Sequence, residues 1–279
     1  MKTGIVDVGG GLRGVYAAGV FDYCMDKGIQ FSVGIGVSAG NANVASYCAG
    51  QRGRNYPFYT DYPFRKEYMS MRNFIFKRSY LDLDYIYSVL SNADGENPLD
   101  YQAFVHSPTE FIGVAANAHT GEAKYFDKSS LHQDDYSVLK ASSAIPFICH
   151  PYEVEGIPYF DGALGDPVPI EKAFAMGCDK VVLILTKPKD IPRAVGQDWR
   201  FAKRIEKAYP LAAEKLRTRA QRYNAGVEAA KRYEAQGKLL IIAPDDTCGV
   251  GTLTKDREAL RNFYKKGYED AQRVTDFIN

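Results

Sequence analysis

Two short apolar runs each end in a glycine-rich turn and continue directly into a helical pattern. Residues 4–8 lead into Gly-Gly-Gly-Leu-Arg-Gly at positions 9–14, and residues 15–27 then have apolar side chains at helical spacing. Residues 31–37 lead in the same way into Ser-Ala-Gly at positions 38–40, followed by small residues over 41–49. A repeated unit of strand, tight turn and helix is typical of a parallel α/β sheet.

The rest of the chain continues this alternation. Further apolar runs predict strands at residues 110–117, 180–186 and 238–243, and a helical pattern over 170–176 ends before Gly177. The basic stretch 199–233 has apolar residues at alternating steps of four and three, which predicts one long helix with a narrow stripe of small side chains. We therefore expect an α/β fold with a mainly parallel sheet.

Composition limits the class of protein. A length of 279 residues fits one large domain, and 35 basic against 34 acidic residues excludes a protein whose whole surface follows nucleic acid. The five cysteines are scattered and form no CxxC pair, so reduced thiols are expected. Neither a secretory leader pattern nor an apolar run long enough to span a membrane is visible, and the expected location is the cytoplasm.

The second glycine turn has the pattern of a nucleophile elbow. Gly36, Ser38 and Gly40 match GxSxG, in which the glycines let a strand and a helix pass closely and hold the serine in a strained, exposed turn. The position between an apolar strand and a helix is the context that this motif requires. A plain strand-to-helix turn is the alternative interpretation.

The first glycine turn allows two functional interpretations. Gly9, Gly11 and Gly14 satisfy the dinucleotide fingerprint GxGxxG, which predicts an acidic residue about 20 positions further on. The next acidic residue after Asp26 is Asp61, so that requirement is not met. The other interpretation takes the glycines as backbone N–H groups that point at one oxyanion, and a simple tight turn is the third.

A serine nucleophile needs a base. The histidines at 106, 119, 132 and 150 are unmarked by neighbouring motifs, although one of them with an earlier aspartate could complete a triad. An aspartate close to the serine could replace histidine if its pKa is tuned by partial desolvation. Asp161, followed by Gly162 and Ala163, is the best candidate, and a turn or helix-cap role is its alternative.

Together, in this order, the GGGxRG loop, the GxSxG elbow and the Asp-Gly-Ala motif resemble the patatin-like phospholipase family. The segment 141–146, Ala-Ser-Ser-Ala-Ile-Pro, is also similar to that family. The resemblance implies a three-layer sandwich around the central sheet in a single domain, with a catalytic core over 3–190. Residues 191–279 are then a helical segment plus a strand that completes the same domain.

The resemblance also implies a mechanism. It gives a serine esterase with a Ser-Asp dyad, lipid acyl esters as substrates, and neither a metal nor another cofactor. Ser38 is then the nucleophile and Asp161 the base. The oxyanion hole is formed by backbone amides of Gly10 and Gly11, with Leu12 or Arg13 as further donors. The Arg13 side chain either orients the loop or meets a phosphate, and an ordinary helix-start role is equally open.

One departure and several alternatives remain. Where many family members have an asparagine after the aspartate motif, this chain has Leu164-Gly165-Asp166-Pro167. A nucleotide-binding protein and a catalytically silent membrane-surface module are the competing functions. The lipid class, the acyl chain length, hydrolysis against acyl transfer, and the oligomeric state are not visible in the sequence.

The stretch 52–78 has the composition of a membrane-contacting surface. Seven basic residues are interleaved there with aromatic ones, and at a lipid surface rings lie at headgroup depth while cations meet phosphates. This predicts peripheral membrane contact, with Arg65, Lys66, Lys77 and Arg78 as the charges to test. The alternative is that the rings line an acyl pocket or pack in the core.

Overall fold

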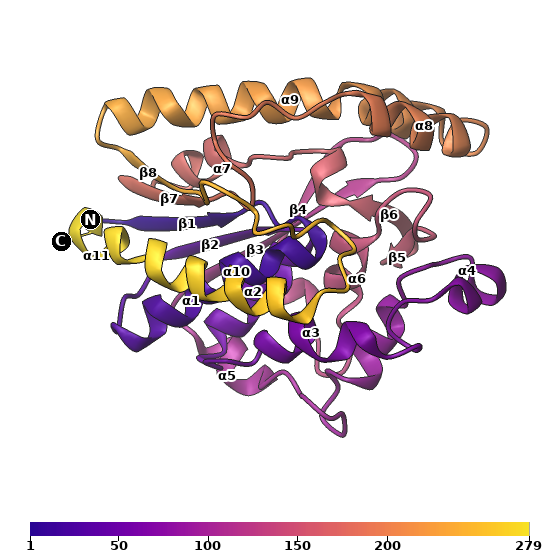
Figure 1. Ribbon diagram of the computed structural model, residues 1–279, viewed down its shortest axis with the longest axis horizontal. Coiled ribbons are helices and arrows are strands. Elements are labelled where there is room, and N and C mark those ends of the chain that lie inside the picture. The colour runs from indigo at the N-terminus through magenta and orange to yellow at the C-terminus, as the bar shows by residue number, and fades with distance from the viewer. Residues whose placement is uncertain (279) are drawn as a thin grey trace.

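One mixed sheet lies at the centre of the computed structural model, which describes residues 1–278 without the side chain of Gln197 (Figure 1). Its strands are β1 Thr3–Asp7, β2 Val33–Val37, β3 Glu110–Asn117, β4 Ala123–Phe126, β5 Tyr152–Val154, β6 Ile157–Asp161, β7 Lys180–Ile184 and β8 Leu239–Ile242. The order is β5-β6-β3-β2-β1-β7-β8, and β4 pairs with β3. The pairs from β3 to β8 through β2, β1 and β7 are parallel, whereas β4, β5 and β6 pair antiparallel.

Helices cover both faces of the sheet (Figure 1). They are α1 Gly14–Asp26, α2 Ala39–Cys48, α3 Tyr56–Thr60, α4 Met71–Lys77, α5 Tyr101–His106, α6 Ser137–Ser143, α7 Ile170–Ala175, α8 Gly196–Ile205, α9 Pro210–Ala235, α10 Arg257–Asp270 and α11 Gln272–Ile278. Helices α7 and α9 pack on one face, and α1, α2 and α10 on the other. The predicted three-layer α/β fold in a single domain is confirmed.

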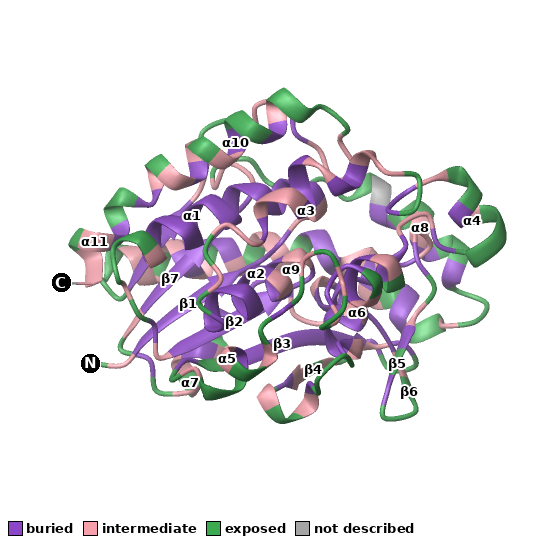
Figure 2. Cartoon of the chain, turned by 90° about the horizontal axis from the view of Figure 1, so that it is seen from below, coloured by how far each residue is buried: buried purple, intermediate pink, exposed green. Residues whose placement is uncertain are grey.

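The central strands are apolar on both faces because each face is covered. In β1, Ile5 belongs to the core beneath α1 and α10, whereas Val6 belongs to the core beneath α7 and α9. Figure 2 shows the buried strands between helices whose outer faces are exposed. Two-sided burial explains why the parallel strands appear in the sequence as continuous apolar runs.

The predicted helix over 199–233 is wrong in one respect, because it is two helices. The chain leaves helical geometry at Tyr209, whose φ of −137° and ψ of 69° precede Pro210. A residue before proline is disfavoured in the α region, and proline favours the first position of the next helix. Helices α8 and α9 then pack together through a buried ion pair in which Arg219 Nε donates to Asp198 Oδ2 at 3.0 Å.

No helix within residues 1–278 has both the length and the apolar character that a membrane crossing requires.

The C-terminal helix α10 lies directly on α1. A Cβ atom added at Gly267 would stand 1.9 Å from the carbonyl oxygen of Tyr16, and one at Gly19 would stand 2.2 Å from that of Tyr264. These distances are far below van der Waals contact, so the two glycines set the separation of the helices. Tyr16 adds a hydrogen bond from its hydroxyl to Asp270 across the contact, at 2.8 Å.

We predict that Gly267→Ala lowers the free energy of unfolding by about 1–3 kcal/mol, the usual cost of overpacking. The clash is with backbone, which has no alternative rotamer. Gly196→Ala is the matched control, because no atom lies within 4 Å of its Cβ position. Urea denaturation of both variants measures the difference, and equal stability of the two would contradict the packing argument.

Candidate active site

Ser38 occupies a strained turn between β2 and α2. Its φ of 57° and ψ of −131° lie outside the regions that side-chain-bearing residues normally adopt. The Ser38 amide donates to Ser142 Oγ at 2.9 Å, and that hydroxyl donates to the carbonyl of Val114 at 2.6 Å. A Cβ atom at Gly40 would lie 2.4 Å from the backbone oxygen of Asp7, so the elbow requires glycine there.

Asp161 reaches Ser38 from the last residue of β6. That strand pairs antiparallel with β3, which is the parallel neighbour of β2. Asp161 Oδ1 accepts a hydrogen bond from the Ala163 amide at 2.9 Å, and the carboxylate also accepts one from the Ser38 hydroxyl. Burial raises the pKa of Asp161 above its usual value, while these two hydrogen bonds act in the opposite direction.

The glycine loop lies against the elbow. Gly9, Gly10 and Gly11 all have positive φ, at 66°, 133° and 62°. The amides of Gly10 and Gly11 donate to no other protein group within residues 1–278, so both are available to a ligand. The amide of Leu12, in contrast, donates to the carbonyl of Thr252 at 2.9 Å and is therefore occupied.

A buried polar network connects the loop to the elbow helix. Asp7 accepts hydrogen bonds from the Gly9 amide at 2.8 Å and from Asn43 Nδ2 at 2.9 Å. Asn43 also donates to the carbonyl of Gly14 at 3.1 Å and accepts from the Tyr59 hydroxyl at 3.0 Å. Burial raises the pKa of Asp7 to about 6, and its hydrogen bonds from Asn43 and Gly9 oppose this shift.

Sequence reasoning missed this network. The available signal was a charged residue, Asp7, inside the apolar run 4–8. Asn43 carries no such signal, because a polar residue in a helix is usually exposed. Ser142 belongs to the segment 141–146 that resembles the family, but no role was assigned to it.

Two cavities meet at Ser38. The first, of about 60 Å³, is largely apolar, and its lining includes Phe58, Tyr59, Tyr68, Leu83 and Ile86. The second, of about 120 Å³, has a mixed lining, and we call it the polar cavity because Gly10, Arg13, Asp161, Arg193 and Arg219 contribute to it. Ser38 and Gly11 line both cavities. A group bound at the Ser38 hydroxyl can therefore extend into an apolar space on one side and a polar space on the other.

The histidines lie elsewhere in the described chain. None of the four lines either cavity at Ser38. His106 forms a hydrogen bond with the carbonyl of Gln102 at 2.7 Å, and His150 forms one with Ser79 Oγ at 2.8 Å.

Asp166 lies in the segment 164–167, where many family members have an asparagine. It accepts a hydrogen bond from the Tyr125 hydroxyl at 2.7 Å.

Comparison with known proteins gives two family matches. Residues 8–174 match the family described as patatin-like phospholipase, and residues 209–278 match a domain of unknown function, DUF6363. The uncharacterized protein YjjU of Escherichia coli (strain K12) is 27% identical over 205 residues, which cover 68% of this chain and 53% of YjjU. The match thus spans about half the length of that relative. The crystal structure of VipD from Legionella pneumophila is 14% identical with a TM-score of 0.47, covering 99% of this chain and 67% of VipD.

The Asp7 network predicts a pH-dependent effect of Asn43→Ala. The variant removes a donor from a buried carboxylate, which costs about 1–3 kcal/mol. Because the raised pKa of Asp7 is about 6, this carboxylate is ionised at pH 8 and mostly protonated at pH 5. The loss in unfolding free energy is therefore larger at pH 8, as urea denaturation at both pH values can measure.

Asn41→Ala is the matched control for this prediction. Asn41 lies on the same helix and is fully buried, but its side-chain oxygen and nitrogen have no partner in the described chain. Its loss of stability should be the same at pH 5 and pH 8. An equal loss at both pH values for Asn43→Ala would show that Asp7 does not depend on Asn43.

Proposed function

The chain belongs to the patatin-like phospholipase family, and on this premise we propose that it is a serine hydrolase that cleaves acyl esters of lipids through Ser38 and Asp161. The observation that carries the proposal is the position of Ser38, which is hydrogen-bonded to a buried carboxylate, beside free loop amides and at the junction of two cavities. The lipid acyl hydrolases are the class to which the family belongs. The Ser-Asp dyad and the individual site residues are part of the proposal.

Acylation begins at the Ser38 hydroxyl. Asp161 accepts the hydroxyl proton while Ser38 Oγ bonds to the ester carbonyl carbon, and the carbonyl π electrons move onto the oxygen. The amides of Gly10 and Gly11 then donate to this oxyanion, with the Arg13 amide at the start of α1 as a further donor. Leu12 is left out of this step because its amide already donates to Thr252.

The second half of the reaction reverses the proton transfer. As the tetrahedral intermediate collapses, the bond to the leaving alcohol breaks and Asp161 returns the proton to that alcohol. Water then attacks the acyl-enzyme with Asp161 again as the base, and the acid product leaves. Burial supports the basic role, since a carboxylate whose pKa is raised accepts a proton more readily than one in water.

The apolar cavity is the proposed acyl site. Aromatic residues of the stretch 52–78, Phe58, Tyr59 and Tyr68, line it beside Leu83 and Ile86. These rings are buried, so this part of the stretch forms a pocket rather than a surface.

The domain division expected from the sequence stays part of the proposal. It has a catalytic core over 3–190, and a helical segment with strand β8 over 191–279 completes the same domain.

We predict that Ser38→Ala and Asp161→Asn each lower turnover of a short soluble p-nitrophenyl ester by at least about a thousandfold. The two residues act as one unit, so the double variant should lose little more than either single one. Single glutamine variants of the four histidines serve as controls and should keep near-native turnover.

Two outcomes would contradict this mechanism. If Asp161→Asn stayed active while a histidine variant lost activity, a histidine triad would replace the dyad. If the parent protein neither hydrolysed esters nor was labelled at Ser38 by a fluorophosphonate, the silent module would be the better description.

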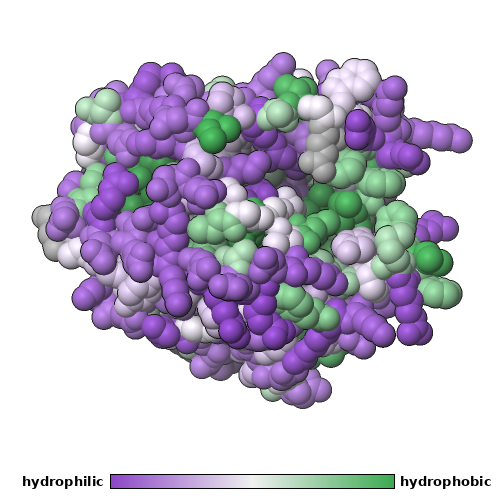
Figure 3. Space-filling model, viewed as in Figure 1, coloured by the Kyte–Doolittle hydropathy of each residue, from purple (hydrophilic) through white to green (hydrophobic). Residues whose placement is uncertain are grey.

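Helix α4 is the proposed contact with a lipid surface. It carries Ile75 and Phe76, whose exposed fractions are 68% and 79%, together with exposed Met71. In Figure 3, apolar side chains gather at the end of the molecule where α4 lies in Figure 1. Lys66, Arg72 and Arg78 are exposed around them and form no ion pair within residues 1–278.

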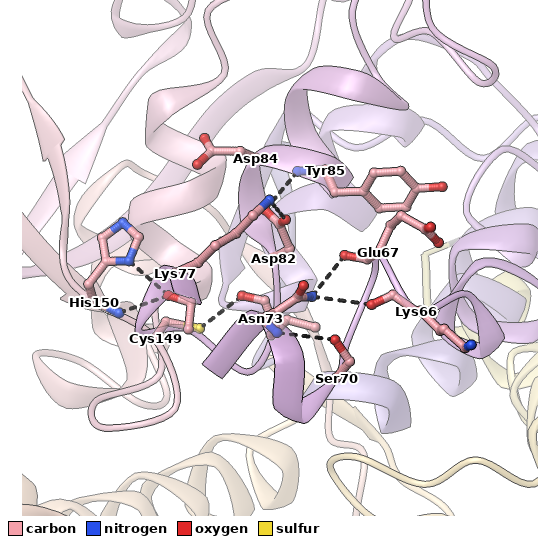
Figure 4. Close-up of polar contacts among 12 residues, drawn as sticks. Lys66, Glu67, Ser70, Asn73, Lys77, Asp82, Asp84, Tyr85, Cys149 and His150 are labelled. Atoms are coloured by element: carbon pink, nitrogen blue, oxygen red, sulfur yellow. Dashed lines mark hydrogen bonds and ion pairs between the residues drawn. The ribbon is translucent and has the colours of Figure 1, made fainter. Parts of the chain in front are cut away.

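Polar contacts hold the inner side of α4 to the domain (Figure 4). Asn73 Nδ2 donates to the carbonyls of Lys66 and Glu67 at 3.4 and 3.0 Å, and Lys77 pairs with Asp82. Arg65 is also engaged, in a two-pronged pair with Glu96 at 2.6 and 2.8 Å. The charges proposed to face the membrane are therefore Lys66 and Arg78, which the sequence also suggested, together with Arg72. Arg65 and Lys77 leave the expected set because each forms an ion pair.

We predict that the double variant Ile75→Ser with Phe76→Ser reduces sedimentation with anionic vesicles but spares hydrolysis of a short soluble ester. Charge reversal at Lys66, Arg72 and Arg78 should weaken the same binding by about 1 kcal/mol per residue, less at high salt. Val105→Ser, at an exposed apolar residue of α5, is the control. Unchanged vesicle binding in the α4 variants would remove this helix from the proposal.

A further inference from the structure

The apolar cavity that is proposed to hold the acyl chain has a polar end. Arg54, Asn55 and Ser91 belong to its lining, together with the aromatic and aliphatic side chains. The proposed hydrolysis at Ser38 gives these three residues no role. Their distance from the reacting serine, and the hydrogen-bonding groups that they leave unused, indicate what a bound acyl chain meets there.

Helix α2 shows how far this polar end lies from the nucleophile. Ala39 and Ala42 line the cavity on successive turns of one helix face, and Ser46 follows on the same face. Ser46 Oγ donates to Asn55 Oδ1 at 2.8 Å and accepts from Arg54 NH1 at 2.9 Å. The cavity therefore extends along α2, over a rise of about 10 Å from Ala39 to Ser46 at 1.5 Å per residue.

Arg54 brings a positive charge without a counter-ion to this end. Its side chain is half-buried, and its guanidinium carbon lies 5.0 Å from the centre of the Phe58 ring, which also lines the cavity. The guanidinium donates four hydrogen bonds, all to neutral oxygens: those of Ser46, Ser91 and the carbonyls of Asn97 and Pro98. One NH1 hydrogen has no acceptor within residues 1–278, because NH1 donates there only to Ser46.

Asn55 adds further donors at the same place. It is 7% exposed, and its Oδ1 accepts from Ser46 Oγ. Its Nδ2 donates to no group of the described chain, although the residue lines the cavity. A buried amide nitrogen without an acceptor costs free energy, which a ligand with acceptor oxygens would recover.

The electrostatic surroundings of Arg54 agree with this geometry. Burial lowers the pKa of Arg54 to about 10. The charges that oppose this shift belong to the phenols of Tyr62, Tyr87 and Tyr136, and no carboxylate of the described chain is among them. An anion bound beside the guanidinium would favour its charged form.

We propose that this end of the cavity binds a carboxylate, so that the preferred acyl group carries a second carboxylate at its far end. A carboxylate accepts paired N–H donors from a guanidinium and supplies the missing counter-charge. With that carboxylate at Arg54 and the chain along α2, the ester carbonyl lies at Ser38 Oγ, and hydrolysis releases a dicarboxylic acid. The inference rests on the proposed function, because it names the acyl group that the same site prefers.

Matched esters test the carboxylate. The p-nitrophenyl esters of octanoic acid, suberic acid and suberic acid monomethyl ester share one chain length and end in a methyl group, a carboxylate and a neutral ester. The suberoyl ester should have a kcat/KM at least tenfold above that of either neutral ester. The succinyl ester should show no such advantage over the butanoyl ester, since its carboxylate is too short to reach Arg54.

Asn55→Asp is the primary variant. It keeps an acceptor for Ser46 Oγ but replaces the free amide nitrogen by an oxygen that repels a carboxylate. The suberoyl-to-octanoyl ratio of kcat/KM should fall at least tenfold in this variant and in Arg54→Gln. Arg54→Lys should keep most of the ratio, since it keeps the charge.

Arg52→Gln is the matched control, because Arg52 is exposed, pairs with Asp26 and lies outside the cavity lining. It should leave the ratio unchanged. An unaltered ratio in Asn55→Asp and Arg54→Gln would overturn the carboxylate site while the hydrolase function stands. Equal hydrolysis of the suberoyl ester and its monomethyl counterpart by the parent protein would do the same.

Binding to the Ser38→Ala protein tests the site without turnover. Octanamide and suberamic acid, which has the same chain length with a carboxylate at the far end, are titrated by calorimetry into this protein and into its combination with Asn55→Asp. Suberamate should bind at least tenfold more tightly than octanamide, and Asn55→Asp should remove the difference. Equal binding of the two would overturn the carboxylate site. Suberamate binding by a protein whose parent hydrolyses none of the esters would uphold the site and overturn the proposed function.

Discussion

The buried carboxylate of Asp7 holds the site together. It stands at the end of the central strand β1 and accepts from both the glycine loop and Asn43 of the elbow helix. The loop and the elbow belong to two successive strand-turn-helix units, and the chain that connects these units does not by itself fix the distance between the two turns. The hydrogen bonds of Asp7 to the loop and to the elbow helix fix that distance. Burying a charge here costs free energy, as the raised pKa of Asp7 indicates. The carboxylate nevertheless provides the acceptor that the Gly9 amide and the Asn43 side chain need.

The parallel part of the fold could be predicted from sequence because its central strands are buried on both faces. Such strands appear as uninterrupted apolar runs, and the two glycine turns mark where helices begin. The break at Pro210 was missed because the apolar spacing continues in phase across it. Ser38 and Asp161 could be paired only through the joint motif, since 123 positions separate them and no periodicity links them.

Other parts of the site were beyond reach of any sequence pattern. Arg13, Arg193 and Arg219 line one cavity only because the β7–α8 connection and α9 fold back over the loop. Arg13 was noted for its motif, whereas the rest are ordinary surface-type residues in the sequence. The stretch 52–78 contains two structurally different parts with the same mixture of residue types. The rings of Phe58 and Tyr59 are buried, whereas helix α4 exposes apolar side chains. Alternating aromatic and basic residues cannot distinguish these roles without the backbone path.

The contact of Leu12 and Arg13 with Thr252 has a consequence for biosynthesis. The Leu12 amide and the Arg13 guanidinium both donate to this residue, 239 positions after Arg13. A ribosome must therefore have passed residue 252 before the glycine loop gains this support. Until then a nascent chain carries the Ser38 turn beside a glycine loop that lacks these two hydrogen bonds.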